Sequence, residues 1–350
     1  MKIVDIRATH PMTPDTPRDW RGWLGQILVA VETEDGLTGY GVGGGGPAGV
    51  HVVRTVLREV LLGQDARDVE GLWMRMYRQT LPFGRKGLAI MALSGVDLAL
   101  WDLRGKREGR SIARLLGGSL RPIPAYATVF KPEDAAKALK AGYRAIKIHL
   151  RTWGMEVSPD RVADLVRGVR ETVGPEVEIM ADAFMSWDIP FALEVARRIA
   201  SYNLTWLEEP LPADDLDGYA RLVESCPVPI AGGEHEFTAA AFEDLMRRRL
   251  HAVFQPDVCW CGGLTQLVKI YEMASQYGVR VCPHRGSEVW ALHAIAALDP
   301  QPLAESGRPW MTWVEGQPRI ENGTVQLVER PGFGVTFDDG LWRAEDQKPR

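Results

Sequence analysis

The sequence predicts an α/β protein in which a barrel of parallel strands follows a smaller α+β domain. From about residue 121 the chain alternates short apolar runs with helical patterns, which is typical of repeated β/α units. Before that point, a strand pair is followed by helical patterns only. We therefore expect an α+β domain over residues 1–120 and a barrel over residues 121–317. We expect the tail, residues 318–350, to rejoin the α+β domain.

The first domain begins with strand signals and continues as helices. Residues 1–9 and 26–33 are rich in β-branched residues, and Asp35-Gly36 turns the chain back into residues 37–42. Helical patterns then cover residues 50–61, 69–79 and 86–106. A hairpin followed by helices is an α+β arrangement, which ends near Gly117-Gly118.

The second region repeats one strand and one helix. The expected strands cover residues 122–128, 145–150, 177–182, 205–209, 228–234, 251–257, 280–284 and 302–306. The expected helices cover residues 133–142, 159–173, 190–202, 216–226, 239–249, 263–278 and 287–297. This alternation favours a parallel barrel over a sandwich. The segment 324–337 of the tail returns to short strands and turns.

Composition argues against several classes of function. The 350 residues carry a net charge of −5, from 41 basic and 46 acidic residues, with no block of like charge, so no nucleic-acid partner is expected. No apolar run reaches the length of a membrane span, and the N-terminus lacks the apolar stretch of a signal peptide. We expect no membrane partner and a cytoplasmic location. The four cysteines are too few for a disulfide scaffold.

A glycine-rich stretch at residues 41–46 fits the G-x-G-x-x-G pattern of dinucleotide-binding proteins. That fingerprint needs a βαβ unit, whereas here the strand belongs to a hairpin and the following helix leads to another helix. We therefore expect no nucleotide cofactor, and a flexible loop over the active site instead.

Three acidic residues close consecutive expected strands at a constant interval. Asp182, Glu208 and Glu234 are separated by 26 residues in each case, which is about one strand–helix unit. Carboxylates at the same end of neighbouring barrel strands converge and would repel one another, so the pattern predicts a hard divalent cation, Mg²⁺.

The other expected strands also end in polar residues. Lys147 and His149 close the second strand and, being two residues apart, point the same way. Asp257 and His284 close adjacent strands, where an aspartate can orient an imidazole and raise its basicity. Glu305 closes the last strand. Together these groups suit proton abstraction α to a carboxylate, followed by stabilisation of an enediolate. They are a divalent cation, a His–Asp base, a lysine and a further acid.

Several motifs resemble those of the enolase superfamily, in its mandelate racemase/muconate lactonizing branch. They include ALSGVDLALWDLRGK, DAFMSWD, NLTWLEE, GEHEFT, QPDVCWCGGLTQLVKI, PLAES and PGFGVTF, and they extend along nearly the whole chain. QPDVCWCGGLT is the most specific of them. Within the branch, the likeness is to acid-sugar dehydratases of the L-rhamnonate type. The resemblance implies a modified TIM barrel, (β/α)7β, with a capping domain built from both chain ends.

The resemblance also implies roles for the strand-end residues. Asp182, Glu208 and Glu234 would bind Mg²⁺, and His284, oriented by Asp257, would take a proton from C2 and then assist loss of the C3 hydroxyl. Glu305 would hydrogen-bond the enediolate or the substrate, and Lys147 would neutralise a carboxylate oxygen. The product would be a 2-keto-3-deoxy acid. The expected partners are a small acid-sugar substrate, such as an aldonate, and further copies of the chain in a homo-oligomer.

The sequence departs from the racemases of this branch on the second barrel strand. Their Lys-x-Lys motif is replaced by Lys147-Ile148-His149, which favours one-base dehydration over two-base racemisation. A racemase or epimerase acting on a 2-hydroxy acid, with His149 as the second base, stays open as the alternative. Arg18 and Arg21, in the N-terminal loop, are either contacts for a substrate carboxylate or solvated surface residues.

Overall fold

The computed structural model describes residues 1–150 and 157–342. Its first unit is an antiparallel sheet in the order β1 (Ile3–Thr9), β2 (Ile27–Thr33) and β3 (Thr38–Gly43). Gly36 lies at φ +81° in the turn from β2 to β3, a conformation that glycine adopts without strain. The predicted hairpin is therefore present, and β1 pairs with β2 along its other edge.

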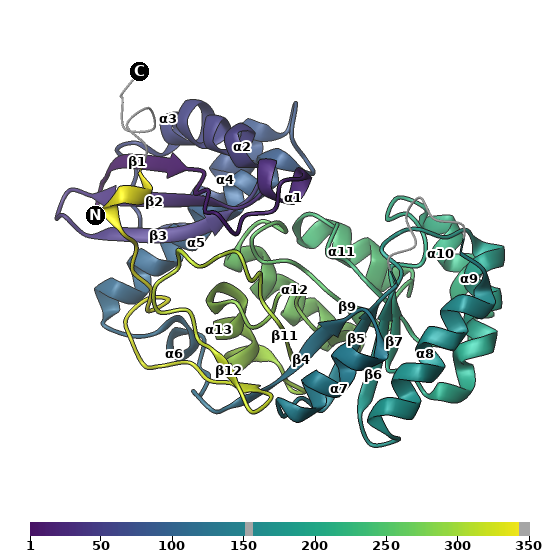
Figure 1. The fold of residues 1–350 in the computed structure, drawn as a ribbon. Coiled ribbons are helices and arrows are strands. Elements are labelled where there is room, and N and C mark those ends of the chain that lie inside the picture. The colour runs from purple at the N-terminus through teal and green to yellow at the C-terminus, as the bar shows by residue number, and fades with distance from the viewer. Residues whose placement is uncertain (151–156, 343–350) are drawn as a thin grey trace.

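Helices surround this sheet (Figure 1). They are α1 (Trp20–Trp23), α2 (Gly46–Val52), η1 (Val53–Leu57), α3 (Arg58–Leu61), α4 (Val69–Thr80) and α5 (Leu88–Glu108). The helix expected over residues 50–61 contains a five-residue π-helical turn, η1, between α2 and α3. The short helix α1 was not expected from the sequence. It begins at Asp19, whose side chain caps it by accepting a hydrogen bond from the Arg21 backbone N–H.

The glycine-rich stretch has a packing role. Gly39, Gly41 and Gly43 alternate on β3 and face α5. A Cβ atom on Gly39 or Gly41 would lie 2.2 Å from a carbonyl oxygen of α5, and one on Gly43 would lie 2.4 Å from another. Only glycine therefore lets the strand and the helix backbone approach so closely. The first part of the expected flexible loop is thus a packed strand.

The second unit is a barrel whose strands run parallel. They are β4 (Ile123–Val129), β5 (Ala145–His149), β6 (Glu178–Asp182), β7 (Trp206–Glu208), β8 (Ile230–Gly232), β9 (Val253–Phe254), β10 (Arg280–Val281) and β11 (Ala304–Glu305). Each strand from β4 to β10 pairs with the next, and β11 pairs with β4. At the remaining junction, the Cys282 thiol lies 3.6 Å from the Leu303 carbonyl oxygen. The alternation in the sequence thus corresponds to these strands.

One short helix, α6 (Ile112–Leu115), precedes the barrel strands, and the other helices of this unit follow them and cover the outside of the ring (Figure 1). These other helices are α7 (Pro132–Lys140), α8 (Pro159–Val173), α9 (Ile189–Ile199), η2 (Ala200–Tyr202), α10 (Leu216–Val223), α11 (Thr238–Arg247), α12 (Leu264–Tyr277) and α13 (Val289–Leu298). From α7 to α11 each helix buries one face and exposes the other, as expected for an outer ring. In contrast, α13 is almost wholly buried.

The barrel interior holds a separate apolar layer, to which each strand or strand flank contributes one side chain. Its members are Tyr126, Ala145, Met180, Trp206, Ala231, Val253, Cys282 and Leu303. Trp206 and Tyr126 pack edge to face with ring centroids 6.0 Å apart. This layer excludes water from the barrel interior, and the polar residues further along the strands lie above it.

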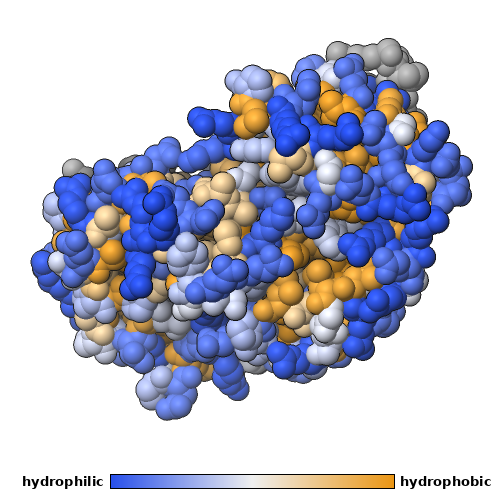
Figure 2. Space-filling model, turned by 180° about the vertical axis from the view of Figure 1, so that it is seen from behind, coloured by the Kyte–Doolittle hydropathy of each residue, from blue (hydrophilic) through white to orange (hydrophobic). Residues whose placement is uncertain are grey.

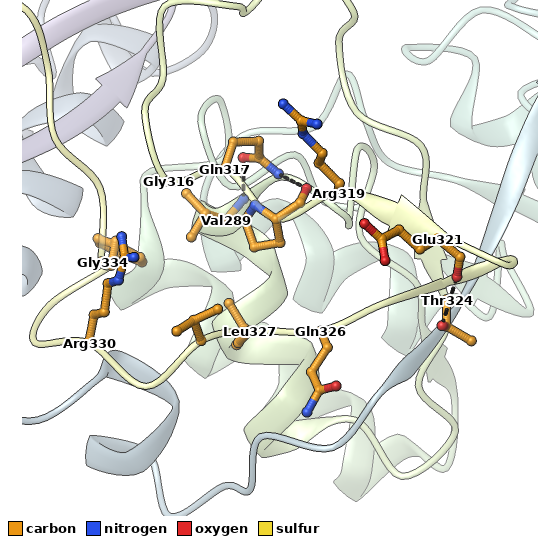
Figure 3. A pocket seen from close by; sticks show the side chains of 13 residues that line it. Val289, Gly316, Gln317, Arg319, Glu321, Thr324, Gln326, Leu327, Arg330 and Gly334 are labelled. Atoms are coloured by element: carbon orange, nitrogen blue, oxygen red, sulfur yellow. Dashed lines mark hydrogen bonds between the residues drawn. The ribbon is translucent and has the colours of Figure 1, made fainter.

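The C-terminal chain joins the two units. It forms β12 (Ile320–Glu321), β13 (Thr324–Val325), which is antiparallel to β4, and η3 (Asp339–Leu341). Gln317 accepts a hydrogen bond from the Val289 backbone N–H, 3.0 Å away, at the start of α13 (Figure 3). Further along, the Phe333 N–H donates to Asp102 of α5. The division of the chain at residues 120 and 317 stays a prediction.

The described residues contain no helix that is both long and apolar enough to cross a membrane. The face in Figure 2 is mostly hydrophilic, with apolar side chains in small separate patches. Scattered patches of this kind are ordinary on protein surfaces.

His293 predicts a pH dependence of stability. Burial lowers the pKa of this side chain from 6.5 to about 4. Its Nδ1 accepts a hydrogen bond from Ala113, and its Nε2 donates one to Phe333. Between about pH 6.5 and 4 the unfolded chain binds a proton that the folded chain does not. The free energy of unfolding should therefore fall by up to about 3 kcal/mol as the pH decreases through this window.

Urea unfolding at several pH values checks this effect. The His293→Gln variant should show a shallower fall than the unmodified protein, whereas His51→Gln, on the surface of α2, should keep the full slope. Equal slopes for the unmodified protein and His293→Gln would contradict the assignment.

Candidate active site

Three predicted site residues lie in one row across neighbouring strands. His149 on β5 is the Cα partner of Asp182 on β6, and Asp182 is the Cα partner of Glu208 on β7. Residues paired in a parallel sheet point to the same face. Asp182 and Glu208 are buried, and His149 is partly exposed to the cavity above.

Lys147 connects several of the acids. Its Nζ atom lies 2.6 Å from Glu208 Oε1, 2.9 Å from Glu305 Oε1 and 3.6 Å from Asp182 Oδ2. Burial alone would lower the pKa of Lys147, but the negative charges around it, led by Glu208, raise this pKa well above its ordinary value. The lysine is therefore positively charged at neutral pH. We call this charged end of the barrel, formed by Lys147, Asp182, Glu208 and Glu305, the barrel floor.

Glu208 has two further donors that sequence reasoning missed. Trp206 Nε1 donates to Glu208 Oε2 over 3.0 Å, and Gln255 Nε2 donates to the same oxygen over 2.7 Å. Both donors were detectable in principle, because each precedes a predicted site residue by two positions in a strand expected from the sequence: Trp206 before Glu208, and Gln255 before Asp257. They fix the orientation of the Glu208 carboxylate.

His284 lies between two carboxylates. Its Nδ1 is 2.9 Å from Asp257 Oδ2, and its Nε2 is 2.9 Å from Glu234 Oε2. Burial would lower the pKa of His284, but the charges of Glu234 and Glu305 raise it to about 10. The structure thus brings together the predicted imidazole and its predicted aspartate, with the other ring nitrogen directed at a predicted metal ligand.

Asp257 is held by a residue that the sequence analysis did not identify. The buried guanidinium of Arg308 donates to Asp257 Oδ2, the same oxygen that contacts His284, and its Nη1 lies 2.6 Å from Glu288 Oε2. Burial would raise the pKa of Asp257, but Arg308 and His284 together lower it. Arg308 follows Glu305 in a loop without periodicity, so no spacing argument could identify it.

Glu305 is also fixed by hydrogen bonds. The backbone N–H of Arg285 donates to Glu305 Oε2 over 2.8 Å, and Thr128 Oγ1 lies 3.4 Å from Glu305 Oε1. Burial would raise the pKa of Glu305, but the charge of Lys147, with smaller contributions from Arg285 and His284, lowers it to about 2. The carboxylate is therefore ionised at neutral pH.

The residues at this end of the barrel suit a hard cation. Burial and the charge of Glu208 raise the pKa of Asp182 well above its ordinary value, and Lys147 offsets this only in part. Such a concentration of buried carboxylate oxygens fits Mg²⁺, which prefers oxygen ligands. Among the described residues, the three ligand atoms that lie within 4.8 Å of one another come from Glu209, Glu234 and His235. This group shares only Glu234 with the predicted set of ligands.

A cavity of about 920 Å³ opens above the strand ends. Its walls include His149, Glu234 and His284 from the barrel. Further wall residues are Thr128, Phe130, Phe184, Ser186, Trp260, Arg285, Ser306, Gly307, Arg308, Pro309 and Trp310. The capping domain contributes Asp19, Trp20, Arg21, Leu24, Gly25 and Gln26. Of the two arginines considered in the N-terminal loop, Arg21 lines the cavity and Arg18 is not among the lining residues.

Comparison with known proteins agrees with this geometry. The family model of the mandelate racemase / muconate lactonizing enzyme N-terminal domain matches residues 21–117, and the enolase C-terminal domain-like model matches residues 132–341. The chain belongs to the mandelate racemase / muconate lactonizing enzyme family. The predicted resemblance is confirmed.

Three members of this family illustrate the likeness. The chain is 38% identical to an L-rhamnonate dehydratase of Saccharopolyspora erythraea, over 90% of this chain and 84% of the relative. It is 35% identical to an arabinonate dehydratase of Saccharolobus solfataricus, over 90% and 89%. The crystal structure of L-talarate dehydratase from Polaromonas sp. JS666, complexed with Mg and L-glucarate, superposes with a TM-score of 0.86 at 29% identity, covering 97% and 96%. These matches confirm the predicted fold class, an α/β barrel with a capping domain.

The Arg308 contacts predict a large effect on stability. Replacement by methionine would leave Asp257 and Glu288 buried without their shared cation, and should lower the free energy of unfolding by about 3–5 kcal/mol. Arg58→Met is the matched control, because Arg58 pairs with Asp5 at the surface, and it should cost about 1 kcal/mol or less. Urea unfolding measures both variants. Similar losses would contradict the assigned role of the buried pairs.

Proposed function

We propose that the chain is a Mg²⁺-dependent acid-sugar dehydratase, a hydro-lyase that forms a 2-keto-3-deoxy acid. The observation that carries this proposal is the placement of His284, whose ring connects Asp257 to Glu234 at the base of the cavity. That arrangement provides an oriented base next to a concentration of carboxylates. The names of the curated relatives, L-rhamnonate and arabinonate dehydratase, support the same reaction class.

We assign the Mg²⁺ ion to Asp182, Glu208 and Glu234. When bound, the ion supplies positive charge that lowers the energy of the enediolate formed on loss of the α-proton. Mg-bound relatives support this assignment. Lys147, which contacts Glu208 and Asp182, would place a second positive charge beside a substrate carboxylate oxygen.

The proton transfers fall to His284. Without the metal ion, the charges of Glu234 and Glu305 keep the ring protonated. With Mg²⁺ held by Glu234, part of this negative charge would be offset, and Nε2 could then remove the proton from C2, while Asp257 holds Nδ1–H and stabilises the imidazolium that forms. The electron pair of the broken C2–H bond would then expel the C3 hydroxyl, which leaves as water with the proton that His284 returns. Glu305, held by the Arg285 backbone and by Lys147, would orient the substrate or the developing enediolate.

A racemase or epimerase is the second candidate. The observation in its favour is that His149 and His284, from strands on different sides of the ring, line the same cavity. His149 packs against Phe130, with ring centroids 5.6 Å apart. Proton exchange at C2 in heavy water without elimination would favour this candidate, and elimination would favour the dehydratase.

The substrate and the surroundings of the enzyme stay predictions. The names of the relatives cover acid sugars with one carboxylate, L-rhamnonate and arabinonate, and one with two, L-talarate. The acid-sugar class is therefore better supported than any single sugar. A homo-oligomeric state, a cytoplasmic location and the absence of nucleic-acid and membrane partners also stay predictions.

A screen of acid sugars tests the reaction. The protein should convert at least one aldonic or aldaric acid into a 2-keto-3-deoxy acid, and chelation should abolish the activity. His284→Asn should lower kcat by at least about 100-fold, because general acid–base catalysis is worth about this much, while Mg²⁺ affinity changes little. Full activity after chelation, or in His284→Asn, would refute the proposed roles.

Calorimetric titration with Mg²⁺ tests the ligands. Asp182→Asn should weaken binding by at least about tenfold, equal to about 1.4 kcal/mol. Glu209→Gln is the matched comparison, because Glu209 belongs to the other group of possible ligands and not to the proposed set. If Glu209→Gln weakened binding strongly and Asp182→Asn did not, the ion would belong to the group of Glu209, Glu234 and His235.

A further inference from the structure

The roof of the cavity comes from the start of α1 in the capping domain, and its charges are paired. Asp19, Trp20 and Arg21 all line the cavity. Arg21 Nε lies 3.0 Å from Asp19 Oδ1 and 3.2 Å from Asp19 Oδ2, and its Nη2 donates to Oδ2 as well. Hydrogen bonding from Arg21 lowers the pKa of the Asp19 carboxyl. We call these two residues the roof pair.

The roof pair is held in place from both sides. Asp19 also caps α1, so its position is set by the local backbone. The Arg21 guanidinium lies 6.0 Å from the ring centroid of Trp310, and Trp310 Nε1 donates to Gln26 over 3.2 Å. Trp310 follows β11 in the chain, so the roof pair contacts the barrel side of the cavity.

The other arginines of the cavity wall also lie near carboxylates. Arg308 contacts Asp257 and Glu288, and Arg285 Nη1 lies 3.9 Å from Glu305 Oε1. Among the described lining residues, every arginine therefore lies within 4.0 Å of a carboxylate oxygen. None of them presents an uncompensated positive charge to the outer part of the cavity.

Aromatic side chains form a large part of the remaining wall. Trp20, Trp260 and Trp310 line it together with Phe130 and Phe184. Such rings pack well against the C–H faces of a sugar chain, and the donors of Arg21 that Asp19 does not use suit hydroxyl groups. The Arg21 and Asp19 side chains are 44% and 42% exposed, so solvent screens them in part. A second carboxylate there would still be repelled by Asp19 and would find the charge of Arg21 already compensated.

We propose that the roof pair makes the enzyme selective for acid sugars with a single carboxylate. The charged end of the substrate lies at the barrel floor, and the uncharged end lies under Asp19, Trp20 and Arg21. Asp19 is the residue that determines specificity, because it neutralises the arginine that would otherwise bind a distal carboxylate. This inference rests on the proposed dehydratase function and adds the class of its substrate.

The Asp19→Asn variant tests the proposal. Asparagine keeps the helix cap and a neutral contact to Arg21 but removes the compensating charge. The measured quantity is the ratio of kcat/KM for an aldarate to kcat/KM for the hexonate of the same configuration. The unmodified protein should prefer the hexonate. In Asp19→Asn the ratio should rise by roughly tenfold, the size of one charge-assisted hydrogen bond. Adding Arg21→Gln should reverse the rise.

Asp65→Asn is the matched control. Asp65 binds Arg67 in the same way, with Arg67 Nε 3.0 Å and 2.9 Å from the two carboxylate oxygens, but neither residue lines the cavity. The ratio should not change in this variant.

Three results would count against the inference. An unchanged ratio in Asp19→Asn, or an unmodified enzyme that prefers the aldarate, would overturn the role of the roof pair and leave the dehydratase function intact. The third result is that the unmodified enzyme dehydrates neither the aldarate nor the hexonate, nor any other acid of the screen, with Mg²⁺ present. In that case the proposed function itself would fail, and the inference with it.

Discussion

The concentration of buried negative charge at one end of the barrel is the constraint on which the rest of the site depends. Asp182, Glu208, Glu234, Asp257 and Glu305 are all buried there. Carboxylates in a low-dielectric interior repel one another strongly, so they persist only with nearby cations. Lys147 lies among Asp182, Glu208 and Glu305, His284 lies between Glu234 and Asp257, and Arg308 holds Asp257. Each cation therefore has a structural and a chemical role.

The two units of the fold depend on each other through this site. The barrel supplies the charged floor and most of the aromatic wall, and the capping domain supplies a roof whose charges are paired. Buried polar contacts link the units elsewhere: Asp97 of α5 accepts hydrogen bonds from the backbone N–H and the hydroxyl of Thr265 at the start of α12. The roof is therefore held at a defined position over the floor, which is what selection by the distal end of a substrate requires.

Much of the barrel could be predicted from the sequence because its signal is periodic. The constant spacing of Asp182, Glu208 and Glu234 indicated where strands end, and the pairing of Asp182 with Glu208 follows from that periodicity. The His284–Asp257 contact was predictable because the two residues follow the ends of adjacent strands, β10 and β9. Arg308 lies in a loop and the roof pair lies at the start of the four-residue helix α1, and both positions depend on tertiary contacts that no local pattern records. The glycines of β3 were misread as a flexible loop because their function, close approach to α5, depends on a partner distant in the sequence.

The location of the metal tests the proposed site most directly. Crystals grown with Mn²⁺ in place of Mg²⁺ would reveal the ion by anomalous scattering. If Asp182, Glu208 and Glu234 bind the metal, one strong peak should lie at about 2.1 Å from their carboxylate oxygens, on the cavity side of Lys147, with the His284 ring facing the same space. A peak bound by Glu209 and His235, or no peak among these strands at saturating Mn²⁺, would contradict this assignment.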